Sequence, residues 1–100
     1  DTDIQAGDRG YALAEKKGIP MVIMEPVRGG LLAGFSQDIN DIFKEAAPDK
    51  SVASWAVRWV ASHPNVKVVL SGMSTPEQVE DNLKTFNHFE PLSESEEATV

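Results

Sequence analysis

Two short, nearly uninterrupted apolar runs limit the folds open to this chain. They are residues 19–24 (IPMVIM) and residues 66–70 (VKVVL). Each has the length of one β-strand, and neither alternates apolar and polar residues as a strand with one wet face would. Such runs are typical of strands buried on both faces of a parallel sheet. Helical segments lie around them, so we expect a parallel α/β fold.

Four other segments have helical character. Residues 6–17 are rich in Ala, Leu, Glu and Lys, and Gly18 is placed to end the helix. Residues 37–47 put apolar side chains on one face. Residues 52–62 are apolar on most sides, so this helix should be heavily buried. The motif TPEQ, beginning at Thr75, is a capping-box pattern with proline in the first turn, and it predicts the start of the last helix.

The composition excludes several classes of function. The chain has 100 residues, enough for one small domain, and no cysteine, so thiolate metal sites and disulfides are excluded within it. Its net charge of −7 argues against binding nucleic acid or anionic membranes. No apolar run approaches the ~20 residues that span a bilayer, and we expect a cytoplasmic protein. His63 and His88 are expected at the surface or at helix ends, and the glutamates of residues 90–97 in a solvated tail or a frayed helix start.

Two parallel strands are too few for an independent sheet, because their edges stay open and too little apolar surface is covered. The apolar helix at residues 52–62 has few other elements to cover it. The sequence therefore predicts part of a larger α/β sheet or barrel, or a unit stabilised by self-association.

Two loops follow the predicted strands, at residues 25–30 (EPVRGG) and 71–75 (SGMST). In parallel α/β folds, ligands bind beyond the carboxyl ends of the strands. Gly29 and Gly30 would let the backbone approach a ligand, Arg28 supplies positive charge, and a helix start favours anions. The same residues also suit a plain strand-to-helix turn, and the pattern alone weighs the two readings equally.

Other signals of chemistry are weak. Neither loop has a GxGxxG or GxxxxGK[ST] fingerprint, and no acid/base pair, triad or metal cluster stands out. Glu25 is the best carboxylate candidate because it ends a strand at the predicted site. Tyr11 is expected to be a phenol that packs in a helix.

Three stretches together resemble the C-terminal part of aldo/keto reductases. They are GIPMVIMEPVRGGLLA (residues 18–33), SVASWAVRWVASHPNVKVVLSGMSTPEQVEDNL (residues 51–83) and PLSESE (residues 91–96). The closest likeness is to the microbial branch that often carries a ferredoxin-like iron–sulfur tail. Any 4Fe-4S cysteines of that branch would lie beyond Val100.

The resemblance implies an (α/β)8 barrel, with residues 19–25 as strand seven and residues 66–71 as strand eight. Residues 1–100 would be a single partial domain, the C-terminal part of that barrel. The family reduces carbonyls with NADPH or NADH by hydride transfer. Its Tyr, Lys, Asp and His catalytic set lies on earlier strands, so the resemblance assigns no catalytic residue here and implies an inactive isolated chain.

The resemblance carries cofactor-binding positions onto both loops. The loop after the first strand would run along the pyrophosphate and the nicotinamide ribose, through Glu25, Pro26, Val27, Arg28, Gly29 and Leu31. The loop after the second strand and its helix would hold the adenosine end, through Gly72, Met73, Ser74, Thr75, Gln78, Asp81 and Asn82. Gln78 and Asn82 share a helix face and are expected to offer amide bonds to adenine or ribose, and Asp81 to accept from the adenine amino group.

One position departs from the family pattern. Many NADPH-dependent members carry arginine where Gln78 stands, and no basic residue lies between Gly72 and Asn82. We therefore expect weak discrimination between the cofactors, or a preference for NADH. The alternative function is a noncatalytic α/β module that pairs with itself or with a partner through its sheet edges. For the barrel portion, the expected partners are the cofactor and the missing N-terminal half.

Overall fold

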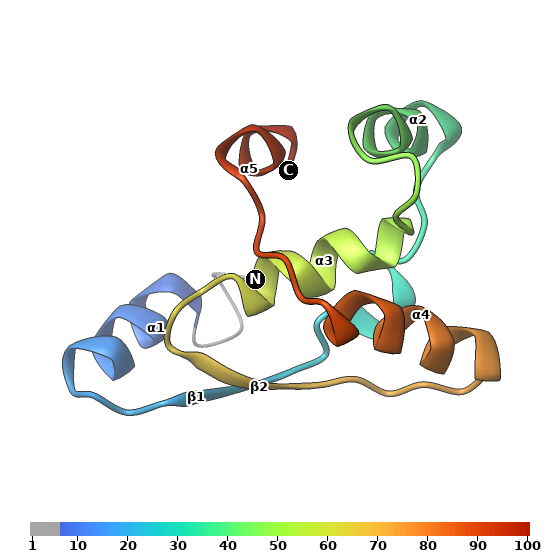
Figure 1. Cartoon of the computed structure of the whole chain (residues 1–100). Coiled ribbons are helices and arrows are strands. Elements are labelled where there is room, and N and C mark those ends of the chain that lie inside the picture. Colours follow the sequence, from blue (N-terminus) through green and yellow to red (C-terminus); the bar gives the residue numbers. More distant parts are fainter. Residues whose placement is uncertain (1–6) are drawn as a thin grey trace.

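The computed structural model describes residues 7–100, and its elements follow the predicted order (Figure 1). They are α1 (Gly7–Lys16), β1 (Met21–Met24), η1 (Arg28–Gly30), α2 (Gln37–Ala46), α3 (Val52–Ala61), β2 (Val66–Leu70), α4 (Pro76–Asn87) and α5 (Glu94–Thr99). Ala6, which the prediction included in the first helix, lies outside the described residues. Within residues 7–100, no helix is long and apolar enough to cross a bilayer.

The two strands pair in parallel, as the apolar runs predict. Val22 lies opposite Val68, and Met24 lies opposite Leu70. A register shift between Met21 and Val22 interrupts the ladder near its start. Helix α3 packs against β2 and lies above the sheet in Figure 1. The shared register brings the carboxyl ends of both strands to the same edge.

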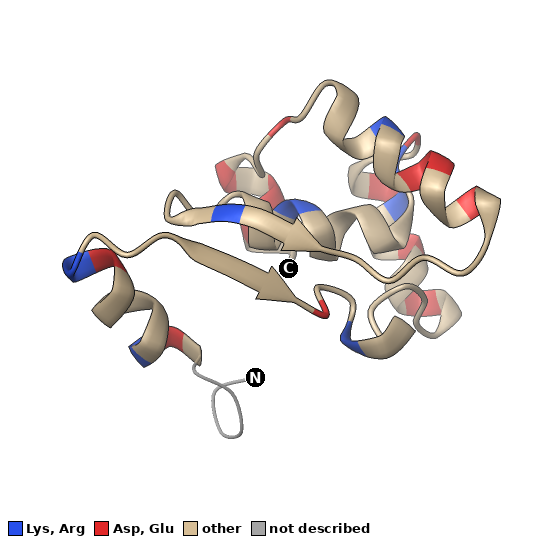
Figure 2. Cartoon of the chain, turned by 90° about the horizontal axis from the view of Figure 1, so that it is seen from below, with Lys and Arg blue, Asp and Glu red and all other residues tan. Residues whose placement is uncertain are grey.

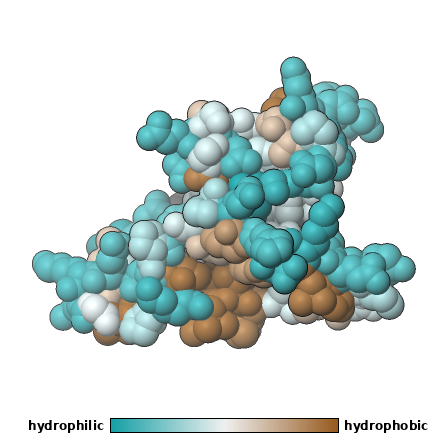
Figure 3. All heavy atoms as spheres, in the orientation of Figure 1, coloured by the Kyte–Doolittle hydropathy of each residue, from teal (hydrophilic) through white to brown (hydrophobic). Residues whose placement is uncertain are grey.

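The other face of the sheet is uncovered, which contradicts the prediction of strands buried on both faces. Val22 and Met24 are 55% and 72% exposed, and Val68 and Leu70 are 47% and 48% exposed. Seen from below, the strands lie side by side with no helix across this face (Figure 2). In Figure 3, which has the orientation of Figure 1, brown apolar atoms gather on the lower side of the molecule, where the strands run. The reason is the size of the sheet, because two strands and the described helices can cover only one side of it.

Local signals set the helix ends. Gly18 adopts a left-handed φ of 68°, and its N–H and that of Ile19 donate to the carbonyls of Glu15 and Ala14, which closes α1 in a Schellman motif. Thr75 and Gln78 form the predicted capping box at the start of α4. Ser51 caps α3 by accepting from the Ser54 amide at 3.1 Å.

The main core cluster is small and lies on one side of α3, while Val57, which is 1% exposed, is buried on another side of the same helix. Trp55 is 2% exposed and clusters with Ala47 and Leu92, while the ring of Phe43 lies 5.0 Å from that of Trp55. The expectation of a heavily buried helix is only partly right, because Trp59 on the same helix is 44% exposed. The described chain has too few elements to surround α3.

A buried arginine fastens the segment after α4 to α3. Arg58 is 3% exposed, and both terminal nitrogens of its guanidinium bond the Glu96 carboxylate, at 3.0 and 2.9 Å. Its Nε donates to the Glu90 carbonyl at 2.9 Å. Glu96 therefore belongs to a helix and to an ion pair in which Arg58 is buried and Glu96 is partly buried, so the prediction of a solvated tail or frayed helix start is wrong for this residue. A bidentate pair of this kind holds both position and orientation.

This ion pair makes the stability of the chain depend on acid pH. The hydrogen bonds from Arg58 are the main cause that lowers the pKa of Glu96 from its ordinary 4.5 to about 2, with help from the Ser93 amide and against the effect of burial. Because the folded pKa is the lower one, the stabilisation is complete above pH 4.5 and is lost as the pH falls toward 2. Its size is on the order of 2–3 kcal/mol.

Urea unfolding at a series of pH values from about 6 to about 2, the range in which carboxylates gain their protons, will measure this loss of stability. We expect the Glu96→Gln variant to lose less stability on acidification than the wild type. Glu97→Gln, on the same helix and exposed, is the control and should follow the wild type. Equal pH profiles for wild type and Glu96→Gln would show that the ion pair contributes nothing.

Candidate functional site

Two loops follow the carboxyl ends of the two strands, at the same end of the sheet, and form the candidate site. Because Met24 and Leu70 are paired, Glu25 and Ser71 follow at the same level of the sheet. In Figure 1 both strands run in the same direction, toward the side of the molecule where α4 lies. We call residues 25–30 the β1 loop and residues 71–75 the β2 loop. The structure thus brings together the two segments that the sequence singled out.

The β1 loop has an unusual backbone. Glu25 and Arg28 have positive φ values of 53° and 49°, and Gly29 and Gly30 have 64° and 99°. Positive φ is uncommon for residues with a side chain, and such strain clusters at functional sites. A Cβ on either glycine would meet nothing within 4 Å, so their need here is conformational and not a matter of space. The loop is closed by bonds from the Gly30 and Leu32 amides to the Val27 carbonyl, at 3.0 and 3.1 Å.

The β2 loop is held by side chains of α4. Gln78 Oε1 accepts from the Ser74 amide at 2.7 Å and from the Thr75 amide at 3.3 Å. In return, Thr75 Oγ1 accepts from the Gln78 amide at 3.3 Å. Asn82 Nδ2 donates to Ser71 Oγ at 3.1 Å. The face shared by Gln78 and Asn82 therefore meets the loop, and at least part of each amide group is already used within the protein.

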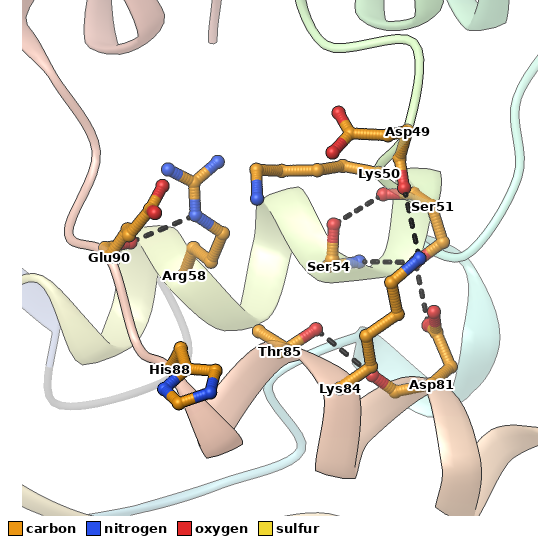
Figure 4. Close-up of a pocket in the computed structure, with 10 residues that line it drawn as sticks. All are labelled: Asp49, Lys50, Ser51, Ser54, Arg58, Asp81, Lys84, Thr85, His88 and Glu90. Carbon is orange, nitrogen blue, oxygen red and sulfur yellow. Dashed lines mark hydrogen bonds between the residues drawn. The ribbon is translucent and has the colours of Figure 1, made fainter.

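Asp81 faces a different direction from its neighbour Asn82. Its Oδ2 accepts from Ser51 Oγ at 2.6 Å, and Lys84, one turn further on, donates to the Asp49 carbonyl at 3.4 Å. Both bonds join α4 to the start of α3. They border a hollow of about 60 Å³, shown in Figure 4, which is lined by polar and charged side chains from both helices. The structure does not direct Asp81 Oδ2 to the β2 loop, and its predicted contact with adenine stays a prediction.

The remaining predicted residues differ in exposure. Pro26 is buried and Val27 is half-buried, so they anchor the β1 loop. Leu31 and Met73 are 69% and 44% exposed and are available for contact. Ser71 is a residue that the sequence did not single out for a role of its own. The sequence could have suggested this contact, because a hydroxyl residue directly after a strand can reach a side chain near the start of the next helix.

Tyr11 and His63 have structural partners near the C-terminal end of α3. Tyr11 Oη accepts from the Asn65 amide at 3.2 Å, and its ring packs edge-on against His63 at 5.3 Å. His63 Nδ1 lies 2.9 Å from the Trp59 carbonyl. Tyr11 is thus the packing phenol that was predicted. No group of three or more His, Cys, Asp and Glu side chains in residues 7–100 could hold a metal ion.

Charge is unevenly distributed around the two loops. The β2 loop has no charged residue, while α4 carries Glu77, Glu80 and Asp81 in its first two turns. The β1 loop carries one residue of each sign, Glu25 and Arg28. Arg28 is thus the positively charged residue of these two loops.

Comparison with known proteins identifies the family. Residues 9–100 match the profile of the Aldo/keto reductase family. The chain belongs to this family. No curated protein matches it.

The fold is also similar to two solved structures of the aldo-keto reductase AKR11C1 from Bacillus halodurans. The holo form gives a TM-score of 0.68 and the apo form 0.67, each at 23% sequence identity. Each match covers 92% of this chain and 36% of the other. The chain thus spans little more than a third of those proteins, and the prediction that it is part of an aldo/keto reductase barrel is confirmed.

Membership in an oxidoreductase family gives the edge loops a chemical context. The β1 and β2 loops lie at the carboxyl ends of parallel strands, which is where barrel enzymes of every chemistry place their sites. The Tyr11–His63 cluster lies at the opposite end, next to the start of β2. Its contacts therefore suit a role in stability.

Proposed function

We propose that this chain is the C-terminal, cofactor-binding portion of an NAD(P)H-dependent aldo/keto reductase, with β1 as strand seven and β2 as strand eight. The pairing of Met24 with Leu70 is the observation that carries the proposal. It brings the β1 loop, with its arginine and two glycines, and the polar β2 loop to the same end of the sheet. A dinucleotide could extend from one loop to the other there. Family membership supplies the class of reaction.

The cofactor would supply the hydride for carbonyl reduction, and this chain would bind and orient it. The β1 loop would follow the pyrophosphate, with Arg28 as its positive charge and Gly29 and Gly30 allowing close approach of the backbone. The β2 loop would receive the adenosine end, with Ser74 and Met73 exposed beside it. Most residues of both loops are exposed, and the β1 loop is held in shape by its own hydrogen bonds, so both loops are accessible to a dinucleotide.

No residue of the chain is proposed to be catalytic. The Tyr, Lys, Asp and His set of the family has no matching position here, so proton transfer would come from the rest of the barrel. That remainder is also the proposed main partner. The exposed side chains Val22, Met24, Val68 and Leu70 form an apolar sheet face on the side away from α3, which would line the interior of a barrel and pack against side chains of its other strands.

The same apolar face supports a second candidate function. A noncatalytic module that self-associates, or binds a partner through its small sheet, would bury the same four side chains. Sedimentation and cofactor titration together separate the candidates. A stable monomer or a discrete dimer that does not bind NAD(P)H would favour the module, whereas a chain that binds NAD(P)H but aggregates would favour an incomplete barrel.

The purified chain will test the proposal directly. We expect no NAD(P)H-dependent carbonyl reduction, together with NAD(P)H-induced shifts of backbone amide signals in the β1 and β2 loops. Amides of the Tyr11–His63 cluster, at the other end of the strands, are the internal control and should not shift. Clear turnover would contradict the assignment of an incomplete enzyme, and shifts confined to other regions would contradict the cofactor site.

A further inference from the structure

Asn65 joins three segments at the amino ends of the strands. Its side-chain Nδ2 donates to the Ile19 carbonyl at 2.8 Å, and its own carbonyl accepts from the Met21 amide at 2.9 Å. Its amide donates to Tyr11 Oη at 3.2 Å. The side-chain bond connects residues 46 positions apart, and the bond to tyrosine connects residues 54 positions apart. The residue that precedes β2 is thus bonded both to α1 and to the segment that enters β1.

Asn65 is also held on the side of α3. The Val66 amide donates to the His63 carbonyl at 3.0 Å, which closes the turn between α3 and β2. The strand pairing shifts register between Met21 and Val22, directly after the bonds of Asn65. These bonds therefore do not simply continue the ladder, and they give the start of β1 a position of its own.

The apolar side chains of the uncovered sheet face do not define the register of the strands by themselves. The side-chain period of a strand is two, so a slip of two residues keeps every side chain on its own face. A slip that set Met24 opposite Val68 would still pair apolar with apolar. On the covered face, it would place Ile23 opposite Lys67 in place of Val69. Only this one apolar pair of the covered face opposes the slip.

Such a slip would separate the two loops of the candidate site. Each residue of a parallel strand advances about 3.3 Å, so two residues would move the β1 loop about 6.6 Å along β2. A hydrogen bond reaches only about 3 Å. A dinucleotide bound to one loop would therefore lose its contacts with the other. The level that the Met24–Leu70 pair gives to the loops depends on what fixes the register.

We infer that Asn65 is a positioning residue: its bonds to Ile19 and Met21 fix the register of β1 against β2, and so hold the β1 and β2 loops at one level, where a single dinucleotide contacts both. This inference rests on the proposed function, because that proposal gives the two loops a shared ligand. Asn65 acts from the amino ends of the strands and does not touch the cofactor. Tyr11 supports it by accepting from its amide.

Three variants separate the side chain of Asn65 from its backbone. Asn65→Ala removes the donor to the Ile19 carbonyl and leaves the backbone bonds in place. Asn65→Asp keeps the size of the side chain, but an ionised carboxylate cannot donate, so this variant should behave as Asn65→Ala does. Asn40→Ala is the matched control, because the Asn40 side chain also bonds backbone atoms, those of Phe35 at 3.0 Å, without involving either strand. Circular dichroism will verify that each variant is folded.

The first arm measures the register without any ligand. The chain has no cysteine, so a pair of introduced cysteines reports which residues meet. Met24→Cys with Leu70→Cys matches the native register, where neighbouring strands lie about 4.8 Å apart, within disulfide range. Met24→Cys with Val68→Cys matches the slipped register, and these positions lie about 8 Å apart when the register is native, beyond disulfide range.

The readout is the initial oxidation rate of the slipped pair divided by that of the native pair. Loss of one hydrogen bond should raise this ratio by about fivefold in Asn65→Ala and Asn65→Asp, and Asn40→Ala should leave it unchanged. A merely destabilising substitution speeds both oxidations through unfolding and does not change the ratio. An unchanged ratio in folded Asn65→Ala would overturn the inference.

The second arm asks whether the register governs cofactor binding. Each cysteine pair is oxidised, and the folded, locked chain is titrated with NADH and NADPH while the backbone amide signals of both loops are followed. The chain locked by Met24→Cys and Leu70→Cys should bind as the wild type does, with one dissociation constant for both loops. The chain locked by Met24→Cys and Val68→Cys should bind about tenfold more weakly or worse.

The outcomes of the second arm distinguish the two proposals. Equal affinity of the two locked chains would overturn the positioning role of Asn65. If neither the wild type nor the chain locked in the native register binds NADH or NADPH, while the oxidation rates change as expected, Asn65 still sets the register and the proposed cofactor site is refuted.

Discussion

Replacing Arg58 with methionine should destabilise the chain by about 3–5 kcal/mol, as expected for the loss of one partner of a buried ion pair. Arg58 is 3% exposed, and its guanidinium bonds the Glu96 carboxylate and the carbonyls of Glu90 and Pro91. Methionine fills a similar volume but leaves all three acceptors without their donor. Because small domains have only about 5–15 kcal/mol of stability, denaturant unfolding should show a large fall in midpoint.

A double-mutant cycle will test whether the loss belongs to this ion pair. Glu96→Gln alone should cost less, because glutamine suits the capping box that Ser93 begins on α5 and can still accept one bond from Arg58. The two substitutions together should cost less than their sum by about 1 kcal/mol or more. Strict additivity, or a loss below about 1 kcal/mol for Arg58→Met, would mean that the pair does not fasten α5 to α3.

The positions of strands and helices could be predicted from the sequence because their signals are local. The capping box at Thr75 and the glycine at position 18 act within one helical turn, and both form as predicted. The degree of burial is not a local property. The apolar run of β1 predicts a strand, but whether Met24 is covered depends on elements beyond these two strands, and it is 72% exposed here.

In the candidate site too, some features follow from local sequence signals and others depend on contacts between distant residues. That the two loops would share an edge follows from parallel pairing, which the apolar runs predict. The directions of individual side chains do not follow, because consecutive helical residues point about 100° apart. Asp81 bonds Ser51 on α3, while Asn82 bonds Ser71 on the β2 loop. The partner of Arg58 is 38 residues distant in the chain, and no periodicity in the sequence connects the two.

The two tryptophans of α3 should differ sharply in their contribution to stability. Trp55 is 2% exposed and packs with Ala47, Leu92 and Phe43, so Trp55→Ala should cost about 3–5 kcal/mol through the cavity it leaves. Trp59 lies one turn away but is 44% exposed, and Trp59→Ala should cost only about 1 kcal/mol. Circular dichroism in urea will measure both losses without relying on the fluorescence that the substitutions remove.

Trp55→Phe will divide the contribution of Trp55 into packing and hydrogen bonding. Within the described chain, the buried Nε1 of Trp55 has no hydrogen-bond partner, so phenylalanine removes a donor that bonds nothing. We expect a cost of about 1–2 kcal/mol from lost contact area, offset in part because no unbonded N–H is left in the core. A cost equal to that of Trp55→Ala would show instead that the indole N–H has a partner, such as a buried water. Because the sequence gives both tryptophans the same apolar context, this comparison isolates what the distant segments around Leu92 and Ala47 contribute to the core.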